Sequence, residues 1–274
     1  MHDKGQIFRE LHNGPGAFII PNPWDTGTAR ILAHLGFKAL ATTSAGMAFA
    51  LGKRDGTVTE AETLAHCRTI VDATPLPVSA DLEKGFGDSP EDAARTIRLA
   101  EEVGLAGASL EDYSGNTQAP IFDFSLAVER IAAAVETRNT LKSDFVLTAR
   151  CENHLHGIGD LDDTLKRLQA FEKAGADVLY APGLGDLDTI STVCKSLERP
   201  VNVVMGLPGT PFGLAELAEV GVRRISVGSA LARSAYGAFV HAAQEMQNEG
   251  TFSFAGQAMG FAELESFFPD PNKV

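Results

Sequence analysis

Short apolar runs alternate with longer amphipathic stretches along the whole chain of 274 residues. The apolar runs are rich in residues that favour β-structure, and they are short enough for strands buried in a parallel sheet. Eight of them are predicted as strands, at residues 17–21, 39–44, 78–82, 107–112, 145–150, 178–182, 201–205 and 224–228. The longer stretches have helical spacing, as at residues 90–103, 126–137, 161–174 and 187–197.

Many of the helical stretches end at a glycine just before the next strand. The same helix–glycine–strand junction recurs at residues 101–107, 172–177 and 218–223. Eight strand–helix units fit a (β/α)₈ barrel, whereas a doubly wound sheet would more often have about six strands. Because no linker interrupts the alternation, the sequence predicts an α/β fold, a (β/α)₈ TIM barrel. We expect one domain over residues 1–274, in which residues 229–274 are a C-terminal helical extension.

Composition narrows the class of protein and of ligand. Hydrophobic residues make up 44% of the chain, which is enough for a substantial core. The net charge of -13 and the isoelectric point near 4.9 disfavour nucleic acid or an anionic membrane as a partner. A small anionic ligand would therefore need a bound cation and an arginine.

Cysteine usage and hydropathy indicate the compartment. Cys67, Cys151 and Cys194 lie far apart, so neither a disulfide framework nor a zinc site is indicated, and Cys151 is read as structural. No apolar run approaches the roughly 20 residues of a membrane span. The polar start at residues 1–4 lacks the profile of a signal peptide. The sequence therefore predicts a cytoplasmic protein without a membrane partner.

Carboxylates recur where predicted strands end. Asp81 and Glu83 are two residues apart, so a strand sends both to the same side, and Glu111 with Asp112 ends the next run. Oxygen ligands gathered in this way suit Mg²⁺ better than zinc. The alternative is that these acids cap the following helices, since residues 88–91 are a good helix start.

Other polar residues fall at the same predicted edge. Small hydroxyl residues at 42–46 have backbone N–H groups that could cradle a carboxylate or phosphate oxygen. Asp55 lies in a polar turn, as a cap or as a site residue. Arg150 ends a strand, where it is either a structural ion-pair partner or a carboxylate clamp, with Glu111 or Glu152 as its neighbours.

Four motifs carry a resemblance to a known family. They are Gly52-Lys53-Arg54-Asp55, the run at 80–87, the run at 108–112, and Ala149-Arg150. In order and spacing they resemble the isocitrate lyase/phosphoenolpyruvate mutase superfamily, from Pro21 to about Gln247. The resemblance implies a Mg²⁺-dependent barrel, with Mn²⁺ as a substitute ion. It would act on a small anionic 2-oxo acid or a derivative, through an enolate intermediate.

The resemblance also implies roles for individual residues. Asp81 would be the direct metal ligand, and metal-bound waters would be held by Asp55, Glu83 and Glu111. The substrate carboxylate would bind at Thr43, Ser44, Ala45 and Gly46. Arg150 would grip the other end of the substrate, and Asn202 could donate to a substrate oxygen.

Departures from the family pattern concern the proton donor. The isocitrate and methylisocitrate lyases carry a Lys-Lys/Arg-Cys-Gly-His loop after the strand-four acids, but residues 113–121 have neither cysteine nor histidine. Tyr113 is a candidate proton donor if it faces the mouth, and otherwise an exposed loop residue. Asn116 or Thr117 is comparable to a polar loop residue of the mutase and phosphonopyruvate hydrolase branches. The catalytic candidates are thus Arg150, Glu111, Tyr113 and Asn116.

Two further candidates are weaker. The family places an aromatic residue where this chain has Ala41, and Trp24 either fills that space or serves packing. His154 and His156 lack a third nitrogen or sulfur ligand, so they are expected at the pocket rim.

Three functions remain open on the sequence. The first is a Mg²⁺-dependent lyase that cleaves a carbon–carbon bond of a small 2-oxo or 2-hydroxy dicarboxylate. This reaction would be an oxaloacetate-like decarboxylation or a retro-aldol or Claisen scission. The second is carbon–phosphorus chemistry, as in phosphoenolpyruvate mutase or phosphonopyruvate hydrolase. The third is a 2-oxo acid binding protein without catalysis.

The tail suggests assembly. Residues 229–247 are predicted as a long helix, followed by the apolar side chains of Phe252, Phe254, Phe261, Phe267 and Phe268. The resemblance implies a homotetramer or dimer in which this terminal helix is exchanged between neighbours. The alternative is a tail packed on its own barrel.

Overall fold

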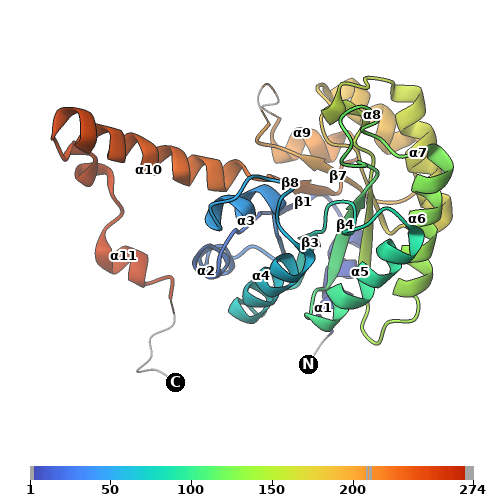
Figure 1. Cartoon of the computed structure of the whole chain (residues 1–274), viewed down its shortest axis with the longest axis horizontal. Helices are drawn as coiled ribbons and strands as arrows, with labels where there is room; N and C mark the ends of the chain where they lie inside the picture. Colours follow the sequence, from blue (N-terminus) through green and yellow to red (C-terminus); the bar gives the residue numbers. More distant parts are fainter. Residues whose placement is uncertain (1–2, 208, 210–211, 269–274) are drawn as a thin grey trace.

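Eight parallel strands form a barrel in the computed structural model, which describes residues 3–207, 209 and 212–268 (Figure 1). Their bounds are β1 (Phe18–Ile20), β2 (Leu40–Ala41), β3 (Val78–Asp81), β4 (Gly107–Glu111), β5 (Val146–Arg150), β6 (Val178–Tyr180), β7 (Val201–Val204) and β8 (Arg224–Ser226). All eight predicted strands are confirmed. In the strand order β1-β8-β7-β6-β5-β4-β3-β2, as far as the structure describes the chain, only the edge between β1 and β2 has no ladder.

Single hydrogen bonds bring β1 and β2 together. The N–H of Ala41 donates to the carbonyl of Pro21 at 3.1 Å. The side-chain amide of Asn22 donates to the carbonyl of Thr42 at 3.0 Å. These two bonds bring together the edges that the ladders leave open, so the predicted (β/α)₈ barrel is confirmed.

Helices surround the barrel (Figure 1). Their bounds are α1 (Lys4–Asn13), α2 (Thr26–His34), α3 (Ser44–Ala50), α4 (Glu60–Ala73), α5 (Pro90–Glu102), α6 (Phe124–Arg138), α7 (Leu161–Ala174), α8 (Leu187–Lys195), α9 (Leu214–Glu219), α10 (Ala230–Glu249) and α11 (Phe261–Glu265). The expected start of α5 is present, because Ser89 and Asp92 form a capping box and Pro90 stands at the first turn. The part of the chain described contains no helix that is both long and apolar enough to cross a bilayer.

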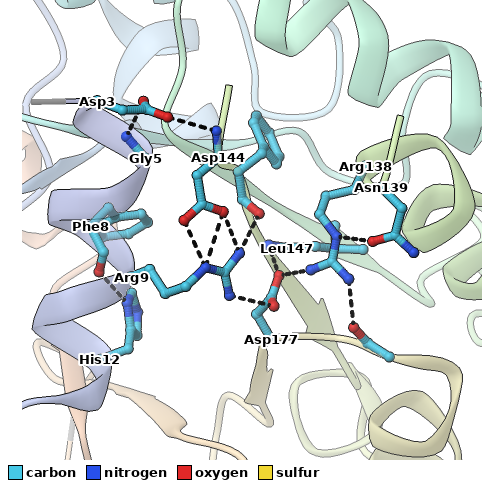
Figure 2. A network of polar contacts seen from close by, with 12 residues as sticks. Asp3, Gly5, Phe8, Arg9, His12, Arg138, Asn139, Asp144, Leu147 and Asp177 are labelled. Carbon is cyan, nitrogen blue, oxygen red and sulfur yellow. Dashed lines mark hydrogen bonds and ion pairs between the residues drawn. The ribbon is translucent and has the colours of Figure 1, made fainter. Parts of the chain in front are cut away.

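Helix α1 closes the amino-terminal end of the barrel. Phe8 is fully buried there, and Arg9 reaches two carboxylates of the barrel loops, with Nε 2.8 Å from Asp144 and Nη1 2.7 Å from Asp177 (Figure 2). Asp177 also pairs with Arg138 of α6. This network of alternating charges attaches α1 to the starts of β5 and β6, which is the end of a barrel that usually serves stability.

One expectation about local structure was wrong. The strand predicted at 39–44 ends at Ala41, and residues 44–46 are instead the first turn of α3. Thr43 caps this helix, because its hydroxyl accepts from the N–H of Gly46 at 3.3 Å. A Cβ at Gly46 would lie 2.6 Å from Thr43 Cγ2 and 3.1 Å from the Cβ of Trp24, so a larger residue would press on the cap and on the segment between β1 and α2.

The C-terminal extension leaves the barrel after β8 (Figure 1). Only Ala232 of the long helix α10 is buried, while Phe239 is 69% exposed and Phe261, in α11, is 81% exposed. The extension touches α2 near its end, where the rings of Phe267 and His34 are 5.1 Å apart. The apolar tail therefore packs little on its own barrel. That residues 1–274 form one domain stays a prediction.

Candidate active site

The acids and the arginine predicted from the strand ends meet at one end of the barrel. Asp81, Glu111 and Arg150 are the last residues of β3, β4 and β5. Glu111 and Arg150 are register partners, so their side chains point to the same side of the sheet. Carboxyl ends of strands are where barrel enzymes carry their catalytic residues.

Arg150 lies among three carboxylates. Its Nη1 is 3.2 Å from Asp81 Oδ1, its Nη2 is 3.3 Å from Glu111 Oε2, and its Nε is 2.6 Å from Glu152 Oε1. The guanidinium also stands over the Tyr180 ring, 5.1 Å from its centroid. Both neighbours expected for Arg150, Glu111 and Glu152, are therefore present. The same cationic group can serve as an internal counter-ion and as a carboxylate clamp.

Backbone groups fix the Asp81 carboxylate. The N–H of Ser44, in the first turn of α3, lies 3.3 Å from Asp81 Oδ2, and the N–H of Glu83 lies 3.4 Å from Oδ1. The N–H of Asp81 itself donates to the hydroxyl of Thr42 at 3.1 Å. The acid is thus held between the first turn of α3 and the turn that follows β3.

The turn after β3 is strained. Glu83 and Phe86 have φ of 50° and 57°, a left-handed conformation that side chains rarely adopt. The carbonyl of Glu83 accepts from the N–H of Glu111 at 3.0 Å, which ties the turn to β4. Buried Arg130 of α6 supports it by donating to the carbonyls of Gly87 at 2.9 Å and Ser89 at 3.1 Å. Sequence reasoning missed Arg130, although an arginine on the apolar face of a predicted helix was a signal.

The crowded carboxylates perturb one another. Burial, and then the charges of Asp81 and Asp55, raise the pKa of Glu83 to about 7. Burial raises the pKa of Glu111 well above its ordinary value, although Arg150 opposes the shift. Partial burial and the charge of Asp81 also raise the pKa of Asp55. Excess negative charge at this mouth is the environment that a divalent cation would relieve.

The acidic side chains at the mouth fit a Mg²⁺ ion that keeps several water ligands. Among residues whose placement is described, no three His, Cys, Asp or Glu side chains are grouped to hold a metal ion. Mg²⁺ commonly uses one or two carboxylates and keeps several waters, so it does not require such a group. The predicted arrangement, with Asp81 as the direct ligand and water held by Asp55, Glu83 and Glu111, is compatible with this geometry. It stays a prediction.

Two cavities open at this end of the barrel. One of about 170 Å³ extends into the barrel and is lined by Ser44, Asp81, Arg150, Tyr180, Asn202 and Arg224 among others. A second of about 600 Å³ lies further out and is lined by Asp55, Glu83, Glu111, Tyr113, Glu152 and His156 among others. Ser44 and Arg150 line both, so the clamp and the first turn of α3 stand where the cavities meet.

The structure distributes the predicted substrate-binding residues unevenly. Thr43, Ser44 and Ala45 line the inner cavity, whereas Gly46 does not. Trp24 lies beside Gly46 but lines neither cavity. Its contact with substrate stays a prediction.

Asn202 and Asn116 differ sharply. Asn202 is 1% exposed and lines the inner cavity, where its Nδ2 donates to Ser226 Oγ at 3.1 Å. Asn116 is exposed and lines neither cavity, and its Oδ1 accepts from the N–H of Gln118 at 2.9 Å within its own loop. Any catalytic role of Asn116 would require this loop to move.

Tyr113 and His156 form a stacked pair at the rim. Their ring centroids are 4.1 Å apart with an interplanar angle of 4°, which joins the loop after β4 to the loop after β5. His156 Nε2 lies 3.8 Å from Glu152 Oε2, and Glu152 contacts Arg150. Tyr113 therefore faces the outer cavity, as a proton donor there would need to.

Other candidates are structural. Asp112 turns away from the cavities and accepts from Arg167 of α7, with Oδ2 3.2 Å from Nη1. Cys151 is fully buried, and burial raises the pKa of its thiol, so it lacks the exposed thiolate of a nucleophile.

Comparisons with known proteins identify relatives over nearly the whole chain. A family model for phosphoenolpyruvate phosphomutase matches residues 8–247. A crystal structure from Burkholderia cenocepacia J2315, described provisionally as that of a lyase/mutase, is 55% identical with a TM-score of 0.95, covering 98% of this chain and 96% of that one. The structure of 2,3-dimethylmalate lyase, a PEP mutase/isocitrate lyase superfamily member, is 30% identical with a TM-score of 0.86, covering 97% and 95%. A Corynebacterium glutamicum protein provisionally named 2-methylisocitrate lyase 2 is 30% identical over 90% of this chain and 82% of its own length.

Proposed function

Because the chain belongs to the phosphoenolpyruvate phosphomutase family, within the isocitrate lyase/phosphoenolpyruvate mutase superfamily, we propose that it is a Mg²⁺-dependent carbon–carbon lyase. Its substrate would be a small 2-oxo or 2-hydroxy dicarboxylate, cleaved through an enolate. Several relatives carry names of lyases, and superfamily lyases generally depend on a divalent metal ion. Decarboxylation of an oxaloacetate-like acid and retro-aldol or Claisen scission are the two forms of this reaction.

One observation carries the proposal. The guanidinium of Arg150 and the carboxylate of Asp81 lie 3.2 Å apart at the junction of the two cavities, beside the N–H of Ser44. An anionic substrate at this place meets a cationic clamp and backbone donors on one side and metal-binding carboxylates on the other. Both kinds of group are needed to bind a 2-oxo acid and to stabilise charge on its carbonyl oxygen.

Each residue has a defined part in the proposed reaction. Asp81 would hold the cation directly, with water held by Asp55, Glu83 and Glu111. The bound cation would polarise the 2-oxo group and stabilise the negative charge that develops when the adjacent carbon–carbon bond breaks. Arg150 would leave the acids to grip a substrate carboxylate, and the N–H of Ser44, which lies beside Asp81, would donate to an oxygen at the same end of the substrate.

The proton donor is the remaining role. Tyr113 lines the outer cavity in a stack with His156, and residues 113–121 contain none of the cysteine or histidine of the lyase loop. We therefore assign the role to Tyr113. The carbon–phosphorus alternative depended on Asn116, which lines neither cavity. This favours the carbon–carbon lyase.

Turnover assays test the proposal. Purified protein with MgCl₂ would be given oxaloacetate, 2-methylisocitrate and phosphonopyruvate, and we expect activity on a carbon–carbon substrate that EDTA abolishes and Mg²⁺ restores. Asp81→Ala should lose both Mg²⁺ binding and activity, because the direct ligand is gone. Turnover of phosphonopyruvate alone would favour the carbon–phosphorus reaction, and tight Mg²⁺-dependent binding without any turnover would favour a binding protein.

We further propose a cytoplasmic homotetramer or dimer in which α10 packs on a neighbouring copy. The exposed apolar side chains that support this lie in the extension: Leu231, Phe239, Val240, Met246, Phe252, Met259, Phe261, Leu264 and Phe268. Exposed apolar side chains gathered on one extension are typical of a protein–protein contact. Light scattering coupled to size-exclusion chromatography tests it, since a mass of 29.0 kDa would mean a monomer and would exclude the exchange.

A further inference from the structure

A buried arginine without a counter-charge lies on the floor of the inner cavity. Arg224, the first residue of β8, is 5% exposed. Its guanidinium contacts three neutral groups: Asn202 Oδ1 at 2.7 Å, Thr148 Oγ1 at 3.0 Å and His12 Nε2 at 3.3 Å. Within the described part of the chain, no carboxylate forms an ion pair with it. A buried charge without a partner is costly, so its presence requires an explanation.

The His12 contact is that of a neutral ring. His12 Nδ1 lies 2.8 Å from the carbonyl of Phe8, which can only accept, so Nδ1 carries the hydrogen. Nε2 is then the acceptor for Arg224. Burial lowers the pKa of Arg224 to about 10, which still leaves it charged at neutral pH. The positive charge at the barrel floor is therefore real and uncompensated.

Arg224 retains unused donors. A guanidinium carries five N–H groups, and the three contacts above use three of them. The cavity of about 170 Å³ reaches both Asp81 and Arg224, and its lining includes the small side chains of Ala41, Ser79, Ser109 and Ser226 beside larger ones such as Tyr180. A ligand entering from the mouth thus has space along the barrel axis.

Strand register connects the mouth to the floor. Arg150 pairs in register with Tyr180, Tyr180 with Asn202, and Asn202 with Arg224. This series of register partners begins at the last residue of β5 and ends at the first residue of β8. It therefore runs from the carboxyl ends of the strands at the mouth toward their amino ends at the floor. Thr148, which Arg224 contacts, is two residues before Arg150 on β5, or roughly 7 Å lower along the strand.

We propose that Arg224, with Asn202 and Ser226 beside it, is an anion subsite that binds the second carboxylate of a dicarboxylate substrate. This inference rests on the proposed function, and it adds the binding site of the second carboxylate. The 2-oxo or 2-hydroxy end lies at Asp81 and Arg150, and the chain extends toward the barrel floor. The rise of roughly 7 Å along β5 from Thr148, which Arg224 contacts, to Arg150 suits a chain of about four to six carbon atoms. A monocarboxylate would leave Arg224 without its partner.

Matched ligands test the subsite on the unaltered protein. Malate and 2-hydroxybutyrate have the same chain length and differ in one terminal carboxylate, as do 2-hydroxyglutarate and 2-hydroxyvalerate. In calorimetric titrations with MgCl₂, we expect the dicarboxylate of at least one pair to bind about ten- to a hundredfold more tightly. Oxalate, which is too short to reach Arg224, reports on the metal end alone.

Variants then assign the effect to Arg224. In Arg224→Met we expect the dicarboxylate advantage to fall to within about threefold, oxalate affinity to be unchanged, and Arg224→Lys to retain part of the advantage. Arg167→Met is the matched control, because Arg167 is also buried but lines neither cavity.

The outcomes separate the two proposals. If oxalate binds but neither dicarboxylate exceeds its monocarboxylate analogue in the unaltered protein, the subsite is wrong and the proposed function stands. If the advantage survives Arg224→Met, the subsite is also wrong. If oxalate fails to bind with Mg²⁺, the proposed function fails and the subsite with it. If Arg224→Met does not fold, Arg224→Lys makes the same test, because an undiminished advantage in that variant would also overturn the subsite.

Discussion

Removing Arg150 should make the stability of the protein depend on a divalent cation. Arg150 is the contact shared by Asp81, Glu111 and Glu152, whose side chains are 20%, 9% and 3% exposed. In Arg150→Met these carboxylates keep their burial and lose their counter-charge. Because a carboxylate left unpaired in the interior retains its desolvation penalty, we expect the free energy of unfolding without metal to fall by about 3–5 kcal/mol.

Mg²⁺ should restore part of this loss. In the variant the cation meets three uncompensated carboxylates, whereas in the wild type it shares them with a guanidinium. A ligand present at about ten times its dissociation constant stabilises the folded state by about 1.4 kcal/mol. At that concentration we therefore expect MgCl₂ to raise the free energy of unfolding of Arg150→Met by about 1.4 kcal/mol, and that of the wild type by less.

Urea unfolding with EDTA and with 10 mM MgCl₂ measures both quantities. Arg167→Met is the control, since Arg167 pairs with Asp112 at 3.2 Å and Asp163 at 2.7 Å, away from the cavities. It should lose stability too, but gain no more from Mg²⁺ than the wild type does. Equal gains from Mg²⁺ in Arg150→Met and Arg167→Met would falsify the view that Arg150 is the internal counter-ion of the metal-binding acids.

Three further predictions concern stability and assembly. The pKa of His12 is about 3, below its ordinary 6.5, because burial and Arg224 disfavour its charged form. As the pH falls, His12 is therefore protonated in the unfolded chain before it is protonated in the folded protein. The free energy of unfolding decreases as the pH falls from about 6.5 toward 3. Between pH 7 and 5, the free energy of unfolding of the wild type in urea should fall by about 2 kcal/mol more than that of His12→Gln. An equal fall in both proteins would contradict this. Arg9→Met should lower the free energy of unfolding by about 1–2 kcal/mol, since the pairs it breaks are partly exposed, and an unchanged urea midpoint would contradict it. Phe239→Asp with Phe261→Asp should reduce the mass seen by light scattering to 29.0 kDa, and an unchanged mass would exclude this surface.

Much of the fold could be predicted from the sequence, because a parallel barrel repeats one local pattern. The helix predicted at 161–174 has the bounds of α7, and the one predicted at 90–103 is α5 to within one residue. The first turn of α3 could not be predicted, because residues 42–46 have the small side chains of a loop. Its helix depends on the Thr43 cap and on close contact of Gly46 with Trp24, which is a tertiary effect.

Site residues at the ends of strands could be predicted from the sequence. Residues whose position depends on the register between strands could not. Asp81, Glu111 and Arg150 could be placed at one mouth because parallel strands end together. The position of Arg224 at the barrel floor could not be predicted, since it follows from the tilt of the strands and from the register pairing of Arg224 with Asn202. The strand-end pattern by itself does not separate Glu111 from Asp112, but in the structure Glu111 lines the outer cavity whereas Asp112 pairs with Arg167.

The left-handed backbone of Glu83 has a consequence for engineering. Glycine tolerates this conformation without strain, so Glu83→Gly would relax the turn by about 1 kcal/mol while deleting one carboxylate from the mouth. Selection for thermal resistance alone would be expected to choose that change. A selected variant that resists heat but has lost its activity would show that the native turn keeps its strained backbone because catalysis requires it.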